Sequence, residues 1–236
     1  MDECMIETRV NIYRRCSGPF PAFQDRFDAG MELVKVLNCG PQPKSFVLAL
    51  PRGGVPVGAA IAECFAAPLD LALVRKLPLP DSPEAGFGAV AIDGSRMLNT
   101  RMVQYYALSD SEIESISDKV VTEVRRRAQD YRGTAHPPEI EGMDVYLVDD
   151  GLATGYTVMA AAKMVRKLQP KSITLCVPVS PADSIAAVTP YFDAIHCLIV
   201  QDFPRFAVAS FFRDFHDMSD GEVREILQKH QRPAAG

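Results

Sequence analysis

The stretch DVYLVDDGLATGYT, residues 144–157, constrains the fold more than any other part of the chain. Its residues 145–148 form an apolar run of the length typical of a buried strand, and a helix is predicted soon afterwards, over about residues 157–168. A short turn of small and hydroxyl-bearing residues separates the two. A strand, a tight turn and a helix in succession are the first half of a βαβ unit. The stretch therefore favours an α/β fold with a parallel sheet.

The turn in this stretch has the composition of a phosphate-binding loop. Backbone N–H groups of such a turn converge with those of the first helical turn, and the helix dipole adds partial positive charge. We therefore predict a phosphate site, in which threonine hydroxyls supplement the backbone. The candidate substrate-binding residues are Gly151, Leu152, Ala153, Thr154, Gly155, Tyr156 and Thr157.

Two adjacent carboxylates, Asp149 and Asp150, stand between the strand and the turn. Paired carboxylates accept hydrogen bonds from vicinal hydroxyls, and they can also hold a hard cation, directly or through water. Acceptors for two hydroxyls beside a cradle for one phosphate describe a site for ribose 5-phosphate. The simpler alternative is an ordinary strand-to-helix turn that binds nothing.

The rest of the chain alternates short apolar strands with helices, as a doubly wound fold does. Two segments lack this periodicity: residues 1–21, which predict a loose N-terminal arm, and residues 77–86. A β-hairpin is expected over residues 87–98. Strands are predicted at residues 45–50, 69–74, 172–178 and 194–200, and helices at residues 22–38, 55–65, 100–107, 109–131, 181–188 and 219–229.

The ends of two further strands carry basic residues. One is followed by Pro-Arg-Gly-Gly, in which Gly53 and Gly54 permit close approach of the backbone to an anion and Arg52 can donate to it. The next is followed by Arg75 and Lys76. Ligands of open α/β sheets bind at the carboxyl ends of the strands. We therefore expect these cations to meet the acid pair at one edge of the sheet.

VDDGLATGYT resembles the phosphoribosyl-pyrophosphate (PRPP) binding motif of the type I phosphoribosyltransferases: four apolar residues, two acids and a loop ending TGxT. PRGG resembles the pyrophosphate loop of that family, and VRK resembles the segment before its mobile catalytic loop. With LPRGGVPV and a GAVA segment, the chain is most similar to a bacterial group usually called predicted phosphoribosyltransferases, whose acceptor is unassigned. The resemblance extends from about Phe27 to Leu227.

This resemblance implies an α/β fold with a Rossmann-like parallel sheet, a small hood and a mobile lid loop. A single phosphoribosyltransferase domain would span residues 1–236, with its core at about residues 42–200 and its hood formed by residues 1–41 and 201–236. The lid would comprise residues 77–98, and the peptide bond between Pro51 and Arg52 would be cis.

The activity implied is Mg²⁺-dependent transfer of a phosphoribosyl group from PRPP to an unidentified acceptor, expected to be a nitrogenous base, with release of pyrophosphate. Mg²⁺, Arg52 and Lys76 would stabilise the departing pyrophosphate. The acid pair would orient the ribose hydroxyls. The expected catalytic residues are therefore Asp149, Asp150, Arg52 and Lys76, with Asp149 and Asp150 as metal ligands and Gly53, Gly54 and Arg75 as further substrate-binding residues.

Ala153 departs from the pattern of one subgroup. Enzymes that use 6-oxopurines carry an acid at the matching position, where it serves the base nitrogen, and alanine cannot do this. A hypoxanthine or guanine transferase is therefore disfavoured, and Glu84 in the lid is a candidate general base. Phe203 and Phe206 are expected either to stack on a flat base or to pack against a terminal helix.

The resemblance implies PRPP and a small-molecule acceptor as partners, and the composition points to neither nucleic acid nor membrane. The net charge of −5 gives no electrostatic footprint for nucleic acid or an anionic membrane, and the arginines at residues 125–132 predict a solvated helix face. No run of 18 apolar residues and no signal-peptide pattern is present. The six cysteines form no CxxC pair. We therefore expect a cytoplasmic protein with reduced thiols. The resemblance adds the expectation of a homodimeric enzyme of nucleotide metabolism.

Two other functions fit the same fold, because fold does not determine function. One is a PRPP- or nucleotide-sensing regulator, which usually adds a DNA-binding domain or a basic RNA-binding face. The acidic sequence shows neither feature. The other is a nucleotide or PRPP hydrolase, in which water takes the place of the acceptor.

Overall fold

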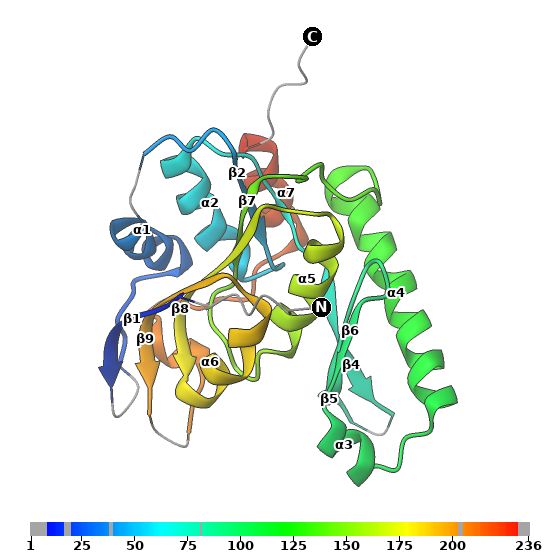
Figure 1. Ribbon diagram of the computed structural model, residues 1–236. Coiled ribbons are helices and arrows are strands. Elements are labelled where there is room, and N and C mark those ends of the chain that lie inside the picture. The colour runs from blue at the N-terminus through cyan, green and yellow to red at the C-terminus, as the bar shows by residue number, and fades with distance from the viewer. Residues whose placement is uncertain (1–8, 17–19, 38–39, 81, 203–204, 231–236) are drawn as a thin grey trace, which may run out of the picture.

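The computed structural model describes residues 9–16, 20–37, 40–80, 82–202 and 205–230. Its main element is a six-stranded parallel sheet in the order β1-β9-β8-β7-β2-β3 (Figure 1). The apolar runs predicted as strands at residues 45–50, 145–148, 172–178 and 194–200 lie inside this sheet, where helices cover them. The strands are β1 (Arg9–Cys16), β2 (Ser45–Ala49), β3 (Leu69–Leu71), β7 (Asp144–Val148), β8 (Ser172–Pro181) and β9 (Ala194–Gln201).

The direction in which the chain crosses the sheet reverses between β2 and β7. Helix α2 (Gly54–Phe65) leads from β2 to β3, whereas α5 (Tyr156–Lys167) leads from β7 the opposite way, to β8. Because such crossovers are right-handed, the two helices cover opposite faces of the sheet. The carboxyl ends of β2 and β7 therefore flank the crevice in which open α/β sheets bind their ligands.

Further helices complete the two layers. Helices α1 (Arg26–Val36) and α7 (Asp220–His230) pack on α2, and α6 (Ala182–Val188) packs on β8 and leads through the 3-10 helix η1 (Thr189–Tyr191) towards β9. Helix α7 begins with the predicted capping box, in which Ser219 and Glu222 exchange hydrogen bonds. A second 3-10 helix, η2 (Val208–Phe211), lies between β9 and α7.

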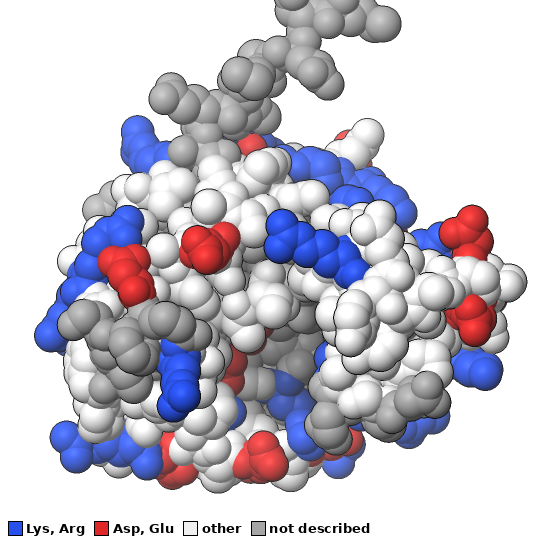
Figure 2. Space-filling model, turned by 90° about the horizontal axis from the view of Figure 1, so that it is seen from below, with Lys and Arg blue, Asp and Glu red and all other residues white. Residues whose placement is uncertain are grey.

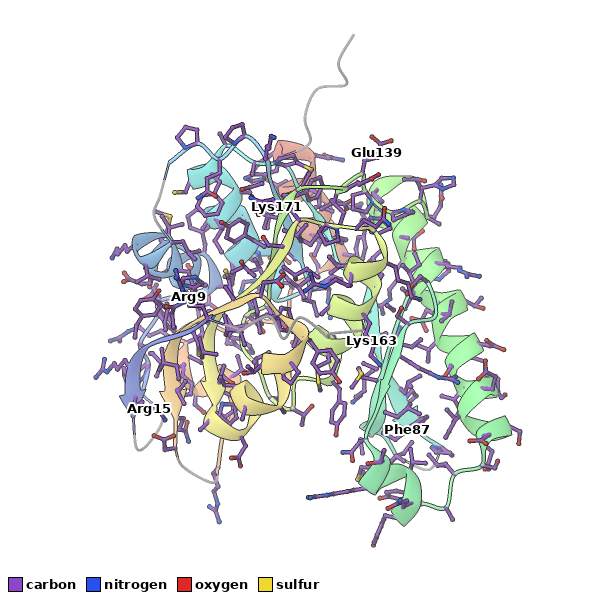
Figure 3. All side chains as sticks on the ribbon, viewed as in Figure 1. Arg9, Arg15, Phe87, Glu139, Lys163 and Lys171 are labelled. Carbon is purple, nitrogen blue, oxygen red and sulfur yellow. The ribbon has the colours of Figure 1, made fainter. Side chains whose placement is uncertain are left out.

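A second, three-stranded antiparallel sheet stands beside the main sheet, at the right of Figure 1. It consists of β4 (Val74–Leu79), β5 (Ser82–Ala91) and β6 (Arg96–Leu98), and it is followed by α3 (Thr100–Tyr105) and α4 (Asp110–Arg132). Helices α4 and α5 both pack on this sheet. Figure 3 shows Lys163 of α5 beside it, where Lys163 Nζ donates to the carbonyl of Arg96 at 3.3 Å.

This second sheet confirms the predicted hairpin but corrects the segment before it. Residues 77–86 were expected to lack regular structure, yet they lie mostly in β4 and β5. Pro78 is accommodated because the pairing of the two strands shifts register on each side of it. The predicted strand at residues 69–74 is likewise divided, because the chain leaves the main sheet after Leu71 and enters the second sheet at Val74.

The expectation of a loose N-terminal arm over residues 1–21 is wrong for residues 9–16. These residues form β1, which pairs in parallel with β9 at the edge of the main sheet. Figure 3 shows Arg9 and Arg15 on this outer strand, on the side of the molecule away from the second sheet. Residues 1–8 and 17–19 lie outside the described residues. The single-domain division and the homodimer stay predictions.

The cysteines depart from the prediction at one position. Cys176 and Cys197 are free and buried in β8 and β9, and burial raises the pKa of both thiols, that of Cys197 to about 12. Cys64 of α2, however, is disulfide-bonded. The prediction of reduced thiols is wrong there, because sequence spacing does not give the distances between α-carbons that pairing requires. None of the described helices is long and apolar enough to span a membrane.

Candidate active site

Two turns of the chain meet at the carboxyl ends of β2 and β7. The N–H of Leu50 donates to the carbonyl of Val148 at 2.9 Å, so the PRGG turn continues directly beside the acid pair. A β-carbon on Gly53 would lie 2.0 Å from Oδ2 of Asp150, and one on Gly54 would lie 2.6 Å from the carbonyl oxygen of Val148. Both glycines are therefore needed for contact between the two turns, which is a role that the sequence did not indicate.

The first of these turns presents Arg52. The peptide bond between Pro51 and Arg52 is cis, as the resemblance implied. The Arg52 side chain is 42% exposed, and its Nη1 lies 3.7 Å from Oδ1 of Asp220 in α7. The same carboxylate oxygen accepts a hydrogen bond of 2.6 Å from the hydroxyl of Tyr131. An exposed ion pair at this separation holds Arg52 weakly, so its guanidinium is available to an anion above the turn.

The two carboxylates have different surroundings. Asp150 Oδ2 accepts a 2.7 Å hydrogen bond from Nε of Arg26 in α1, and the N–H of Asp150 donates to Oδ1 of Asp149 at 2.9 Å. Burial raises the pKa of both carboxyls, and the charge of Asp150 raises that of Asp149 further. Arg26 acts in the opposite direction on Asp150. A cation bound beside the pair would offset the repulsion that remains.

The turn after the acid pair is an open cradle. It ends at Gly155, whose φ of 80° lies in the left-handed region and which directly precedes α5. Among the described residues, no side chain caps α5, so the N–H groups of its first turn are available to an anion. Ala153 and Thr154 are exposed, and the carbonyl of Ala153 accepts a hydrogen bond of 2.6 Å from the hydroxyl of Ser184. That contact fixes the cradle to α6.

The other predicted residues of the turn are less open. Gly151 is buried against Val179 and Val208, which leave no room for a β-carbon. Leu152 is also buried, and its N–H donates to the carbonyl of Val179 at 2.9 Å. Tyr156 and Thr157 begin α5 and are half-buried. The cradle that an anion can reach is therefore formed by residues 153–157.

Comparison with known proteins decides the family. The sequence model of the phosphoribosyl transferase domain matches residues 24–210, which is most of the chain. The chain belongs to the phosphoribosyl transferase domain family. This family includes two curated relatives from strains of Mycobacterium tuberculosis, each provisionally named a phosphoribosyl transferase and each 38% identical over 213 residues. The match covers 90% of this chain and 48% of each relative, so the chain spans about half the length of those relatives.

A solved structure supports the same fold. The crystal structure of the protein TT1426 from Thermus thermophilus matches this phosphoribosyl transferase domain with a TM-score of 0.70 and 32% sequence identity. The match covers 88% of this chain and 98% of that one. The predicted fold, a Rossmann-like α/β sheet of the type I phosphoribosyltransferases, is thereby confirmed.

Two cations that were expected at the end of a main-sheet strand lie elsewhere in this phosphoribosyl transferase domain. Arg75 and Lys76 belong to β4, because the chain has already left the main sheet. Lys76 is exposed, and Gly86 of β5 makes room for its stem, since a β-carbon there would lie 2.4 Å from Cγ of Lys76. Arg75 forms an ion pair with Glu123 of α4.

The arginines of α4 are not simply a solvated face, as the sequence had suggested. Arg127 Nε lies 3.3 Å from the carboxylate of Glu123, so Glu123 lies between two arginines, Arg75 and Arg127. The side chain of Arg132 is only 7% exposed and forms a 2.9 Å ion pair with Asp70. The Arg127–Glu123 pair follows helical spacing, but helical periodicity could not show the other two pairs, because Arg75 comes from β4 and Asp70 from β3.

The molecule is hollowed between the main sheet and the second sheet, and side chains of both charges lie in the hollow (Figure 2). Figure 2 views the molecule from below, which is the side toward which the main-sheet strands point in Figure 1. The hollow therefore opens on the side where the carboxyl ends of β2 and β7 place the acid pair. The side chain of Glu84, the candidate general base, is not among those that the structure describes.

The acid pair fits Mg²⁺ only as a partial ligand set. Among the described residues, no group of three or more His, Cys, Asp or Glu side chains is arranged to hold a metal. Mg²⁺ commonly binds through one or two carboxylates and takes its other ligands from water and substrate phosphates. Asp149 and Asp150 supply two adjacent carboxylates, and a bound cation would favour their ionised forms against the burial that raises both pKa values, so the pair is compatible with that mode of binding.

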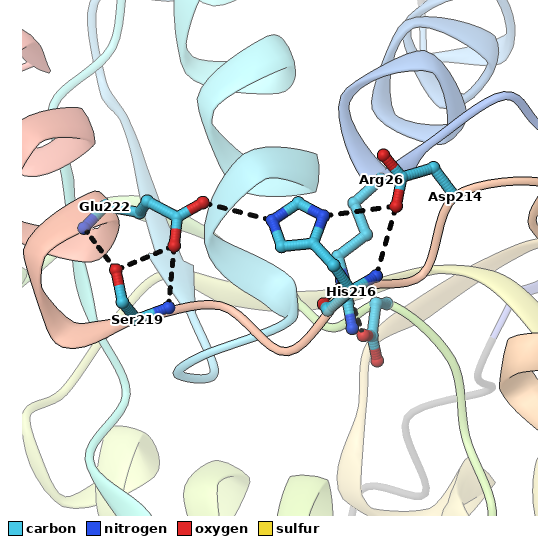
Figure 4. Close-up of polar contacts among 6 residues, drawn as sticks. Arg26, Asp214, His216, Ser219 and Glu222 are labelled. Carbon is cyan, nitrogen blue, oxygen red and sulfur yellow. Dashed lines mark hydrogen bonds and ion pairs between the residues drawn. The ribbon is translucent and has the colours of Figure 1, made fainter.

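The sequence patterns did not predict a polar network that lies beside the acid pair. His216 lies between Asp214, at 3.2 Å from Nδ1, and Glu222, at 3.0 Å from Nε2, and its backbone carbonyl accepts a 2.8 Å hydrogen bond from Arg26 (Figure 4). These residues line a pocket of about 230 Å³ between α1 and α7.

Of the two phenylalanines considered for stacking on a base, Phe206 packs on Phe211 with ring centroids 5.7 Å apart, while Phe203 lies outside the described residues.

Proposed function

We propose that this protein binds PRPP with Mg²⁺ and transfers its phosphoribosyl group to the nitrogen of a small-molecule acceptor, releasing pyrophosphate. One observation carries the proposal: the PRGG turn and the acid pair are in contact at the carboxyl ends of β2 and β7, and an uncapped helix N-terminus follows the acids. The turns proposed to bind pyrophosphate, ribose hydroxyls and 5-phosphate would thus adjoin one another in the order that PRPP needs, which supports the proposal.

The cradle would hold the 5-phosphate. The N–H groups of residues 153–157 lie at the start of α5, where the helix dipole favours an anion. The hydroxyls of Thr154 and Thr157 would add donors. With the 5-phosphate fixed there, the ribose ring would lie over the acid pair. The binding energy of the phosphate would thus help to hold C1 in the orientation needed for the reaction.

The acid pair would act on the ribose. Asp149 and Asp150 accept hydrogen bonds from the vicinal hydroxyls, and their charge favours the positive charge that develops on the ring as the bond to the leaving group lengthens. Mg²⁺ would be held by the same carboxylates and by substrate oxygens, and it would supply further positive charge to the diphosphate.

The pyrophosphate would lie over the PRGG turn. Arg52 can exchange its weak contact with Asp220 for the diphosphate oxygens, and Lys76 on the second sheet is proposed as a further cation. In the reaction the C1–O bond breaks and its electron pair leaves with pyrophosphate, while the acceptor nitrogen forms a bond to C1 and loses its proton to a base. Residues 77–98, the segment of the second sheet from β4 to β6, are the proposed lid over this site.

The proposed acceptor is a class of compound, the nitrogenous bases, and one feature of the cradle bears on which bases fit. Ala153 is exposed in the cradle and carries no titratable group, so the acid that 6-oxopurine enzymes place there has no counterpart. This observation supports the earlier inference that hypoxanthine and guanine are poor candidates.

The test is to incubate the protein with PRPP and Mg²⁺ and to follow pyrophosphate with and without a panel of nitrogenous bases. Release that requires one base, with formation of the matching nucleotide, supports transfer. Release without any base indicates a hydrolase, and tight PRPP binding without turnover indicates a sensor. Absence of both binding and turnover would overturn the proposal.

A further inference from the structure

We propose that Arg26 is a positioning residue of the PRPP site, which fixes the carboxylate of Asp150 for its contact with the ribose. The inference rests on the function proposed above. Arg26 does not belong to any of the motifs in the sequence, and it reaches the acid pair from α1, more than a hundred residues away along the chain.

The guanidinium of Arg26 is held by three different groups. Its Nε donates to Oδ2 of Asp150 at 2.7 Å, and its Nη1 donates to the carbonyl of His216 at 2.8 Å. Its Cζ lies 3.8 Å from the centroid of the Phe215 ring, so the guanidinium lies over an aromatic face. A planar donor held on two edges and one face has little freedom, and a lysine could not reproduce this arrangement.

The carboxylate of Asp150 is confined on two sides. Arg26 binds Oδ2, and the PRGG turn approaches so closely that Gly53 has no space for a β-carbon beside the same oxygen. The two charged side chains are 9% and 15% exposed, so each depends on the other for the interactions that water would otherwise supply. Asp150 is therefore held in one orientation by Arg26 and by the PRGG turn.

Arg26 also makes the two acids unequal. It offsets the charge of Asp150, whereas Asp149 receives a hydrogen bond from the Asp150 backbone and no comparable cation among its described hydrogen-bond partners. This arrangement assigns orientation of the ribose to Asp150, the acid that Arg26 holds directly. A pair of this kind binds a substrate with a preformed geometry and so avoids part of the cost of ordering side chains.

The alternative is that Arg26 only stabilises the fold, as a buried ion pair elsewhere does. The chain contains a matched control for this. Arg132 and Asp70 form an ion pair of 2.9 Å with side chains 7% and 21% exposed, and it lies between α4 and β3, away from the acid pair. Loss of either arginine should lower thermal stability, because each leaves a partly buried carboxylate unpaired.

The experiment measures PRPP binding by calorimetry in the presence of Mg²⁺ for the full chain and four variants: R26M, D150N, the double variant R26M/D150N, and R132M. We expect R26M to weaken PRPP binding about tenfold, which corresponds to about 1.4 kcal/mol, and R132M to change it less than about twofold. In the D150N background, R26M should weaken binding less than about twofold further, because its effect passes through Asp150.

An equal effect of R26M in the wild-type and D150N backgrounds would overturn the inference, as would an equal loss of affinity in R132M. If R26M does not fold, R26K takes its place, because lysine keeps the charge but not the planar fork. An equal effect of R26K on PRPP affinity in the wild-type and D150N backgrounds would then overturn the inference. If the wild-type protein binds no PRPP, the proposed function itself is overturned and this inference with it. If the wild type does bind PRPP, a failure of the Arg26 inference can be told apart from a failure of the proposed function.

Discussion

Gly53 and Asp150 are in such close contact that a single added β-carbon on the glycine would lie 2.0 Å from Oδ2 of the carboxylate. The two residues come from different motifs that are far apart in the sequence. Gly53 has a φ of −62°, which any residue can adopt, so the requirement for glycine there is one of space and not of backbone conformation.

Gly53→Ala should therefore damage the site more than the fold. Pushing the PRGG turn away from the acid pair by even part of an ångström would misplace Arg52 and Asp150 together, and we expect pyrophosphate release to fall at least about a hundredfold. The matched control is Gly221→Ala on the exposed start of α7, where the nearest atom to the new β-carbon is Ser219 Oγ at 3.6 Å. That variant should be as active as the wild type and slightly more stable.

Asp150→Asn should abolish most turnover while the protein stays folded. The change removes the charge that favours a cationic ribosyl ring but keeps the size of the side chain, so we expect pyrophosphate release to fall about 100- to 1,000-fold. Circular dichroism should show unchanged secondary structure. Unaltered pyrophosphate release in a folded variant would mean that the acid pair does not act on the ribose.

Arg52→Ala should raise the PRPP concentration needed for half-maximal rate by about tenfold, because a charge-assisted contact to the diphosphate is lost. Arg15→Ala on β1 is a suitable control, since Arg15 also forms an exposed ion pair, with Asp202 at 3.0 Å, but lies at the far edge of the main sheet. Steady-state kinetics of both variants make the comparison. Equal KM values for PRPP in all three proteins would remove Arg52 from the site.

His216 should give the protein a measurable pH dependence. Hydrogen bonds to Glu222 and Asp214 raise the pKa of His216, so the folded state favours the protonated ring. The stabilisation of the folded state by His216 is therefore fully present below the ordinary histidine pKa of about 6.5. It is lost as the pH rises through the raised pKa of His216 in the folded protein. Glu222 stays ionised throughout this range, because hydrogen bonds from Ser219 and His216 lower its pKa to about 2.

The measurement is the difference in melting temperature between the wild type and His216→Gln at about pH 5.5 and about pH 8.5, on either side of the ordinary histidine pKa. We expect the difference in melting temperature to be smaller at the higher pH. The change should be modest, because the ring of His216 is exposed. A difference that grew with pH would show that the ring is bound in its neutral form. Asp150→Asn does not touch this network directly and should show the wild-type trend.

The central strands and their turns could be predicted because the information is local. The apolar runs at residues 45–50 and 145–148 are largely buried, so each reads as a strand without knowledge of its neighbours. The PRGG turn and the acid pair follow these strands directly. Their meeting then depends only on the rule that ligand sites of open sheets lie at carboxyl ends.

The missed features depend on residues far away in the sequence. Strand β1 is a half-exposed edge strand with several arginines, so it has no apolar run to mark it. On α1, the apolar spacing points to Phe27 and Met31, which are 40% and 41% exposed, and not to Arg26, which is 8% exposed. A charged residue is buried there because Asp150 and the segment at residues 215–216 supply its partners, and no pattern within the helix records them.

The pairing of β1 with β9 has a consequence for how the chain is made. Tyr13 and His196, which are hydrogen-bonded across these strands at 2.8 Å, are 183 residues apart. At a synthesis rate of about 5–20 residues per second, roughly 10–40 s separate the emergence of β1 from that of its partner. During that interval the half-apolar strand Arg9–Cys16 is exposed beside an incomplete sheet, so a ribosome-bound chaperone that covers it should raise the yield of native protein.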